Sequence, residues 1–291
     1  MSLAKAAVAV GGAALLTAGT TYGIYSVMDP MPSDFVVLSK DTNYSTTYSS
    51  SNDKVGELYG NYLISPYGLT SSSENSDKPK DNKNWWEWSY RRLKSDLKGK
   101  NVLSADFLSS NIKHPYKTSG QILNNDEKAL NEICETVYGK TKTDIFKRAG
   151  DSDDNKENLR KDLFKYCSFF WEAPKTIGET KGESYSGNTS YGKKYESKLI
   201  GTKGNDIFWE TRNKEFFEGG EGNKGIGKDL SADTDSLFHG LYSTKGKPDQ
   251  GNIKETCKKA YALQEGSTGT TPKTTKGNVF KFCSLEKKEI S

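Results

Sequence analysis

The chain has 291 residues, enough for two domains of ordinary size or one large domain. Its 42 Lys and Arg residues nearly balance its 38 Asp and Glu residues, and only five of the basic residues are Arg, which argues against a nucleic-acid-binding protein. Hydrophobic residues make up 33% and aromatic residues 11%, which predicts small cores joined by long polar loops rather than a disordered chain.

The first predicted element is an apolar N-terminal segment. Residues 6–28 form an uncharged stretch of 23 residues. As a helix this stretch would extend roughly 34 Å, enough to cross the ~30 Å hydrocarbon core of a bilayer. We predict that residues 1–28 are an uncleaved membrane anchor, with a cleaved signal peptide and a soluble buried helix as alternatives. Lys5 precedes the stretch and Asp29 follows it, which favours a cytoplasmic N-terminus with the bulk of the chain outside the cell membrane.

A tandem duplication follows, after a predicted linker at residues 29–55. Aromatic, acidic and cysteine landmarks recur at a constant offset of 123 residues, and the 48-residue spacing from tryptophan to cysteine is the same in both copies. The aligned landmarks are Trp86 and Glu87 with Trp209 and Glu210, Cys134 with Cys257, and Tyr138 with Tyr261. A shared spacing of this length indicates two similar domains, so we predict repeat unit 1 at residues 56–172 and repeat unit 2 at residues 173–291.

Related motifs open and close each predicted unit. The opening motif is a tyrosine followed four residues later by Leu-Ile, at Tyr59 and at Tyr195. The closing motif is Phe-Lys-aromatic-Cys-Ser, at residues 164–168 and 280–284. The alternation of aromatic residues in the second closing motif predicts a short strand, whereas the polar stretch before the first one is able to carry a helix into it.

Helical periodicity dominates the middle of both units. Apolar residues recur at the spacing of an amphipathic helix around the first cysteine of each pair. These stripes consist of Leu130, Ile133, Cys134, Val137 and Tyr138 in unit 1, and of Ile253, Cys257, Ala260 and Tyr261 in unit 2. A further stripe in unit 1 consists of Trp86, Tyr90, Leu93 and Leu97, with Trp209 and Phe216 as its counterpart in unit 2.

Capping signals frame the helices that carry these cysteines. Asn124-x-x-Glu127 and Asn252-x-x-Glu255 both have the form of a capping box, which places a helix start at each of them. Gly139 is a predicted helix stop in unit 1.

The four cysteines form two matched pairs. In an oxidising compartment such pairs indicate disulfides, and the duplication favours Cys134–Cys167 and Cys257–Cys283 among the three connectivities, because each copy must once have folded alone. The alternative is four free cysteines that act as small buried hydrophobes. The predicted fold class is therefore mainly α with short β segments: an N-terminal transmembrane helix followed by two tandem homologous, small, disulfide-stapled units.

No catalytic, cofactor-binding or metal-binding residue is predicted. The chain has only two histidines and no HExxH or CxxC motif, and its cysteines are paired rather than nucleophilic. The glycine-rich stretch at residues 220–229 partly matches a dinucleotide fingerprint and a phosphate loop. However, a charged helical pattern precedes it, and Asp229 stands where a magnesium-binding hydroxyl is needed. We interpret it as a polar loop, with nucleotide binding as the weaker alternative.

The apolar N-terminus and the two units with spaced Trp and closing Cys motifs resemble the large paralogous families of uncharacterised proteins of haemotropic mycoplasmas. The first 26 residues and the closing motifs carry most of the resemblance, although Tyr166 and Phe282 stand where these families more often have Trp. The resemblance implies a membrane-anchored surface protein without catalytic activity and without a cofactor. It also implies host-cell or antibody contacts as the role of the polar loops.

Two functions from different classes therefore follow from the sequence. The first is a non-enzymatic surface protein, held in the membrane by residues 1–28, that takes part in host interaction or antigenic variation. The second is a structural membrane protein that dimerises through its anchor, where Gly19 and Gly23 have the small-xxx-small spacing of helix pairs. No nucleic-acid partner is expected, and the sequence does not fix an oligomeric state.

Overall fold

The computed structural model of the chain describes residues 30–41, 43–48, 53–68, 81–99, 101–124, 126–147, 151–219, 224–266 and 271–286. The predicted anchor at residues 1–28 lies outside the described residues and stays a prediction. Among the residues in these nine ranges, no helix combines the length and the apolar character needed to cross a bilayer.

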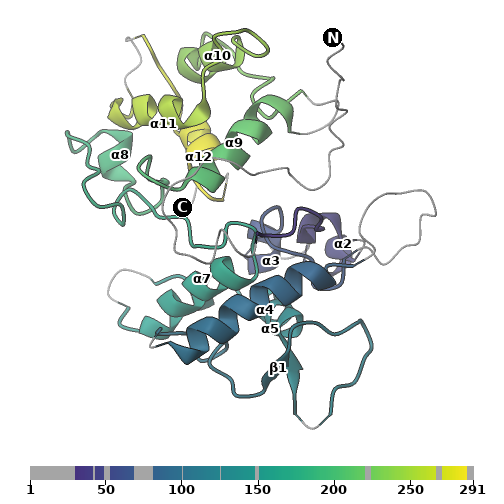
Figure 1. The fold of residues 1–291 in the computed structure, drawn as a ribbon. Helices are drawn as coiled ribbons and strands as arrows, with labels where there is room; N and C mark the ends of the chain where they lie inside the picture. Colours follow the sequence, from purple (N-terminus) through teal and green to yellow (C-terminus); the bar gives the residue numbers. More distant parts are fainter. Residues whose placement is uncertain are drawn as a thin grey trace, which may run out of the picture. The chain divides into compact units, whose positions relative to one another are not determined.

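The chain divides into two compact units, Met1–Ala173 and Pro174–Ser291 (Figure 1). The sequence-based boundary between the two repeats lies one residue earlier. Helices account for most of the regular structure in both units, and each unit carries one disulfide. The prediction of a mainly helical protein with two disulfides is therefore confirmed for the described part of the chain.

Unit 1 consists of short N-terminal helices, a long helix, a small two-stranded ladder and three further helices. Its described helices are η1 (Leu38–Lys40), α2 (Tyr44–Thr47), α3 (Val55–Tyr59), α4 (Lys83–Lys98), α5 (Leu130–Tyr138), α6 (Lys142–Ile145) and α7 (Asp154–Tyr166). The strands β1 (Ile112–His114) and β2 (Lys128–Ala129) pair in parallel between α4 and α5. Helices α4, α5 and α7 pack against one another and form the centre of the core.

The long helix α4 buries an aromatic face. Trp85, Trp86 and Trp88 are all less than 5% exposed, and the Trp85 and Trp86 rings meet edge to face at 4.9 Å. The predicted stripe extends one turn too far, because Leu97 is 39% exposed. The helix ends one residue later at Lys98, so its last turn reaches beyond the core.

Helix α5 begins later than the capping signal predicts. Its first residue is Leu130, because Lys128 and Ala129 form β2 and pair with β1. The Glu132 carboxylate accepts the N–H of Ala129 at 3.2 Å, so the capping interaction occurs several residues beyond Asn124. The prediction of a cap at Asn124 is wrong, whereas the helix does end at Gly139.

Unit 2 has five described helices. They are α8 (Tyr191–Lys194), α9 (Asp206–Glu218), α10 (Ser236–Tyr242), α11 (Ile253–Ala262) and α12 (Lys276–Cys283). Helix α11 lies at the centre and packs against the other four. Its predicted cap is confirmed, because the Asn252 side chain accepts the N–H of Glu255 at 2.9 Å.

The closing motif of unit 2 is helical, so the prediction of a strand is wrong. Helix α12 contains Phe280, Phe282 and Cys283, and all three are fully buried. Because Val279 is also buried, the buried positions follow the i, i+1, i+3, i+4 spacing of one helix face rather than the alternation of a strand. Thr275 caps the helix by accepting the N–H of Asn278 at 3.2 Å.

Part of the predicted linker at residues 29–55 belongs to unit 1. Leu38, Tyr48 and Val55 are at most 5% exposed. The N–H of Leu38 donates to the carbonyl of Leu63 at 2.8 Å. This segment therefore contributes to the core before the sequence-based start of the unit at residue 56.

Candidate functional site

The two disulfides occupy equivalent places in the two cores. Cys134–Cys167 and Cys257–Cys283 both have a Cα–Cα distance of 5.8 Å, and all four cysteines are fully buried. They join the central helix of each unit to its closing helix, which is the pairing that the duplication predicts. The four cysteines are therefore structural, and the described chain has no free thiol.

The tyrosine landmarks hold main-chain carbonyls beside the disulfides. The Tyr138 hydroxyl lies 2.9 Å from the carbonyl oxygen of Ile64 and 3.1 Å from that of Cys167. The Tyr261 hydroxyl lies 2.7 Å and 3.2 Å from the equivalent carbonyls of unit 2. Burial raises the pKa of both tyrosines well above the usual range, so both remain neutral donors. Their role is to satisfy buried carbonyls.

The tryptophan landmarks also donate to buried main-chain carbonyls, whereas the glutamates beside them lie at the surface. The indole N–H of Trp86 donates to the Ser65 carbonyl at 3.3 Å, and that of Trp209 donates to the Gly201 carbonyl at 2.9 Å. Glu210 is exposed, and Glu87 lies 3.9 Å from Lys83 on the surface of α4. Each glutamate therefore lies on the surface of its own unit, Glu87 on α4 of unit 1 and Glu210 on α9 of unit 2.

Sequence analysis missed an asparagine that recurs at the same offset of 123 residues. The Asn82 side chain donates to the carbonyls of Val36 and Ser65 at 2.9 Å and 2.7 Å, and accepts the N–H of Val36 at 2.8 Å. Asn205 makes the same three hydrogen bonds in unit 2, with Lys175 and Gly201. The shared offset was the available signal.

A glycine that precedes each opening tyrosine was missed as well. A Cβ atom at Gly56 would lie 2.5 Å from the ring of Tyr48, and one at Gly192 would lie 2.5 Å from the ring of Tyr185. Each glycine therefore lets an aromatic ring approach the helix backbone closely. The sequence signal is a glycine three residues before Tyr59 and before Tyr195.

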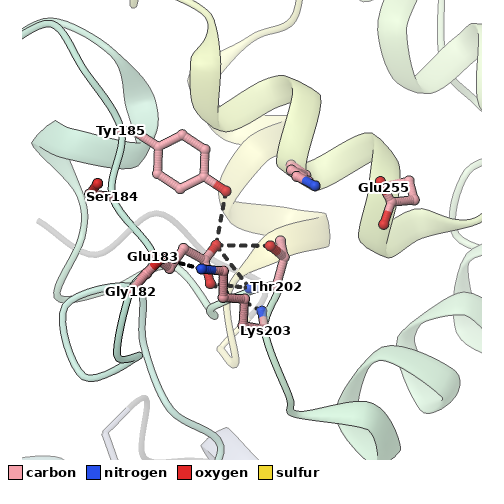
Figure 2. A pocket seen from close by; sticks show the side chains of 8 residues that line it. Gly182, Glu183, Ser184, Tyr185, Thr202, Lys203 and Glu255 are labelled. Carbon is pink, nitrogen blue, oxygen red and sulfur yellow. Dashed lines mark hydrogen bonds between the residues drawn. The ribbon is translucent and has the colours of Figure 1, made fainter.

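Unit 2 has a shallow polar hollow of about 260 Å³ (Figure 2). It lies between the loop that precedes α8, the segment that precedes α9, and one side of α11. The lining residues are Gly182, Glu183, Ser184, Tyr185, Thr202, Lys203, Glu255 and Lys258. Because charged groups of both signs and hydroxyls line it, this hollow is the candidate binding site of unit 2.

The Glu183 carboxylate anchors one wall of the hollow. It accepts the N–H groups of Thr202 and Lys203 and the Thr202 hydroxyl at 2.7–3.1 Å. It also accepts the Tyr185 hydroxyl at 2.8 Å, and Figure 2 shows this hydroxyl directed at the carboxylate. Burial raises the pKa of Glu183, but these donors together outweigh burial and hold the pKa below its usual value. A carboxylate so fully engaged is a structural anchor rather than a general base.

Asp162 is a buried carboxyl of unit 1. Its side chain on α7 accepts the N–H of Ser104 at 2.7 Å and the hydroxyl of Ser104 at 2.8 Å. Burial raises the pKa of Asp162 to about 6, although these two donors oppose the increase. A carboxyl with such a pKa suits proton transfer. However, Asp162 is only 3% exposed, and its hydrogen bonds hold the loop at Ser104.

The described part of the glycine-rich loop caps a helix C-terminus. Residues 220–223 lie outside the described residues. The N–H groups of Ile226 and Gly227 donate to the carbonyls of Glu215 and Phe216 at 3.0 Å and 3.1 Å. These carbonyls belong to the last turn of α9, where the helix dipole is negative and repels an anion. The described residues therefore do not form a phosphate cradle.

Metal-ligand chemistry is sparse in the described ranges. They contain no cluster of three or more His, Cys, Asp or Glu side chains suited to a metal ion. His114 and Glu127 lie 2.8 Å apart and form an isolated pair at the surface of unit 1.

Comparison of the chain with protein-family models, with curated proteins and with solved structures finds no match.

Proposed function

We propose that the chain is a membrane-anchored protein of the cell surface that acts by binding rather than by catalysis. The observation that supports this proposal is the pair of buried disulfides, one in each unit. Disulfides form and persist in oxidising environments and are rare in a reducing cytosol. They therefore support a location outside the cytoplasm, which agrees with an anchor at residues 1–28.

The side chains around the landmarks support a binding role. The Glu183 carboxylate is engaged by hydrogen bonds within unit 2, and the recurring Tyr, Trp and Asn side chains hold main-chain groups. One difference between the units lies in the connection between the long helix, α4 or α9, and the central helix, α5 or α11. In unit 1 it carries β1 and β2, and in unit 2 it carries α10. Such connections are where binding residues concentrate on rigid scaffolds, so we infer that they meet the host cell or antibodies.

Two measurements on intact cells test the location. Protease added outside the cells should remove the chain, and peptide mass spectrometry without reductant should find Cys134 joined to Cys167 and Cys257 joined to Cys283. A parallel digest with reductant is the control that releases each peptide separately. Full protection from protease, together with four free thiols, would place the chain in a reducing compartment and end this proposal.

A further inference from the structure

The first two turns of α5 and α11 are equivalent, and in unit 1 this surface is covered by the chain itself. At the offset of 123 residues, Asn131, Glu132 and Glu135 of α5 correspond to Lys254, Glu255 and Lys258 of α11. The equivalence rests on the flanking core positions, where the aligned residues are buried in both units.

In unit 1 the segment that follows β1 lies on this surface. The Lys117 ammonium group lies 2.6 Å from the Glu132 carboxylate. The Asn131 side chain accepts the N–H of Lys117 at 3.1 Å and donates to its carbonyl at 2.9 Å. A lysine is therefore held by its charge and by both of its main-chain groups. Tyr67 closes the neighbouring side, because its hydroxyl donates to Glu135 at 2.6 Å.

In unit 2 the equivalent surface forms one wall of the polar hollow. Glu255 and Lys258 are exposed and line it. Lys203 stands where unit 1 has Tyr67, since both follow the Leu-Ile pair of the opening motif by the same number of residues. None of the lining residues comes from the connection between α9 and α11, which is the counterpart of the segment that contains Lys117.

We propose that the hollow of unit 2 binds a segment of a partner polypeptide, in the place that the chain's own residues 115–118 occupy in unit 1. The volume of about 260 Å³ lies below the range of about 300–1,000 Å³ that is usual for sites of whole organic ligands, and it suits a few side chains. The five hydrogen bonds of Glu183 fix one wall in advance, which lowers the ordering cost of binding.

The charges of the hollow define the partner segment. Glu255 keeps the carboxylate that holds Lys117 in unit 1, so the partner carries a lysine or arginine at that point. Lys258 stands where unit 1 has Glu135, which accepts the Tyr67 hydroxyl. The partner of unit 2 therefore places a carboxylate beside the Lys258 ammonium group. The negative charge of Glu255 argues against a phosphate ligand. This inference does not depend on the side of the membrane that the chain faces, so it can fail independently of the proposed location.

A peptide titration tests the proposal with the full chain in detergent. The probe is a fluorescein-labelled peptide of residues 113–119, Lys-His-Pro-Tyr-Lys-Thr-Ser, and binding is read as fluorescence polarisation. We expect saturable binding that Glu255→Lys weakens about fivefold, as expected for the loss of one partly exposed ion pair. Lys254→Asn should tighten binding, because the amide restores the main-chain contacts made by Asn131 in unit 1. Glu210→Lys, the same charge change on an exposed part of α9, should leave binding unchanged.

Several results would overturn the proposal. One is the absence of saturable binding by both the unmodified chain and the Lys254→Asn variant at millimolar peptide. Another is binding of the peptide to the Glu255→Lys variant as tightly as to the unmodified chain. Equally tight binding of a peptide in which Glu replaces the second lysine would count in the same way, because the proposal requires attraction between a basic side chain and the Glu255 carboxylate. A third is saturation of the hollow by inorganic phosphate, abolished by Lys258→Glu, without peptide binding, which would identify an anion site instead.

Discussion

The Asn82 side chain holds three main-chain groups of unit 1 at once. It is 1% exposed, and its partners belong to two segments far apart in the sequence, at Val36 and Ser65. Removal of the amide leaves the N–H of Val36 without its acceptor, which costs about 1–3 kcal/mol. It also takes one donor each from the carbonyls of Val36 and Ser65, which keep the N–H of Ser65 and the indole N–H of Trp86. We therefore expect Asn82→Ala to lower the free energy of unfolding by about 3 kcal/mol, measured by urea denaturation.

The matched control for this prediction is Asn84→Ala, in the first turn of α4, which begins directly after Asn82. Asn84 is exposed, so its replacement should change the free energy of unfolding by less than about 0.5 kcal/mol. Equal effects of the two substitutions would show that the hydrogen bonds of Asn82 do not hold the N-terminal segment on α4.

Asp162 makes the stability of unit 1 depend on pH. Its pKa in the folded chain is about 6, above the ordinary value of 3.8 that applies when the chain is unfolded. The folded state therefore binds the proton more tightly, so the stability that protonation contributes is complete below pH 3.8 and is lost as pH rises through 6. A difference of this size corresponds to about 3 kcal/mol.

Asp162→Asn should remove this dependence, because the amide stays neutral and its oxygen still accepts from Ser104. We expect the melting temperature of the variant to rise relative to that of the unmodified chain between about pH 4 and pH 7, and the difference to level off above that range. Asp233→Asn, at an exposed position, is the control. A difference between Asp162→Asn and the unmodified chain that does not change with pH would contradict the assignment.

At the scale of residues, the offset of 123 residues marks positions that have equivalent partners in both units. The first cysteine of each disulfide, the tyrosines and the tryptophans align at this offset, whereas the second cysteines align only through the closing motif. The arginines could not be found in this way. Arg92 lies six residues after Trp86 and Arg212 lies three residues after Trp209, yet both donate to the carbonyl of the lysine in the closing motif. Arginines at different positions of α4 and α9 therefore reach equivalent carbonyls, those of Lys165 and Lys281, and a sequence alignment does not show this.

At the scale of elements, the closing helices depend on an arginine from the neighbouring helix. Arg212 of α9 is fully buried and donates to the carbonyls of Lys281 and Ser284, at the C-terminal end of α12, at 2.6 Å and 2.8 Å. Carbonyls in the last turn of a helix have no partner within the helix, and a cation there also interacts favourably with the helix dipole. The guanidinium group therefore caps α12.

Arg212→Met should destabilise unit 2 by about 3 kcal/mol, because it keeps most of the side-chain volume and removes both donors. Arg212→Lys should destabilise unit 2 less than Arg212→Met does. An ammonium group is able to reach one of the two carbonyls but lacks the planar fork that donates to both. Hydrogen exchange measured by mass spectrometry should show faster exchange in residues 276–284. If the two variants behave alike, the fork-shaped contact is not what stabilises α12.

The sequence predicted the apolar faces of the central helices correctly. Its errors concern the start of α5 and the conformation of the closing motif, which depend on contacts with neighbouring elements. Helix α11 has both its apolar stripe and its cap at the expected positions. Helix α5 has its stripe, but the pairing of Lys128 with Ile112 delays its start. In α12 the alternating aromatic residues are compatible with a strand or a helix, and the buried neighbours Val279 and Cys283 decide for the helix. Such tertiary contacts are not visible in a short window of sequence.

At the scale of the whole molecule, each unit has its own disulfide. The bridges close loops of 33 and 26 residues and do not connect the units. By the chain-entropy estimate, each contributes about 3–4 kcal/mol by restricting the unfolded state. The double substitution Cys257→Ala and Cys283→Ala should therefore destabilise unit 2 by about that amount.

Hydrogen exchange measures this prediction unit by unit. Protection should fall across residues 174–286 and stay unchanged in residues 53–68 and 126–147 of unit 1. Replacement of Cys134 and Cys167 by alanine should give the reverse pattern, which makes each double variant the control for the other. Loss of protection in both units from either variant would show that they unfold together.

The sequence predicted two similar units but not where the first begins. Polar residues around Asn43 and Ser51 have the composition of a linker, and only the burial of Leu38 and Tyr48 shows that this segment closes the core of unit 1. The hollow of unit 2 was also beyond prediction, because it depends on which connection covers the central helix. Periodicity predicts helices, whereas the path of a long loop depends on contacts across the fold.

The burial of the four cysteines constrains how the protein can be made. Their side chains have no exposed surface, so an oxidase or a small oxidant has no access to them once the cores have closed. The bridges must therefore form while the chain is still open, in competition with its collapse. A chain that collapses with reduced thiols would keep them until it opens again. Production of the protein should accordingly succeed by export into an oxidising compartment, and late addition of oxidant to a collapsed, reduced chain should be inefficient.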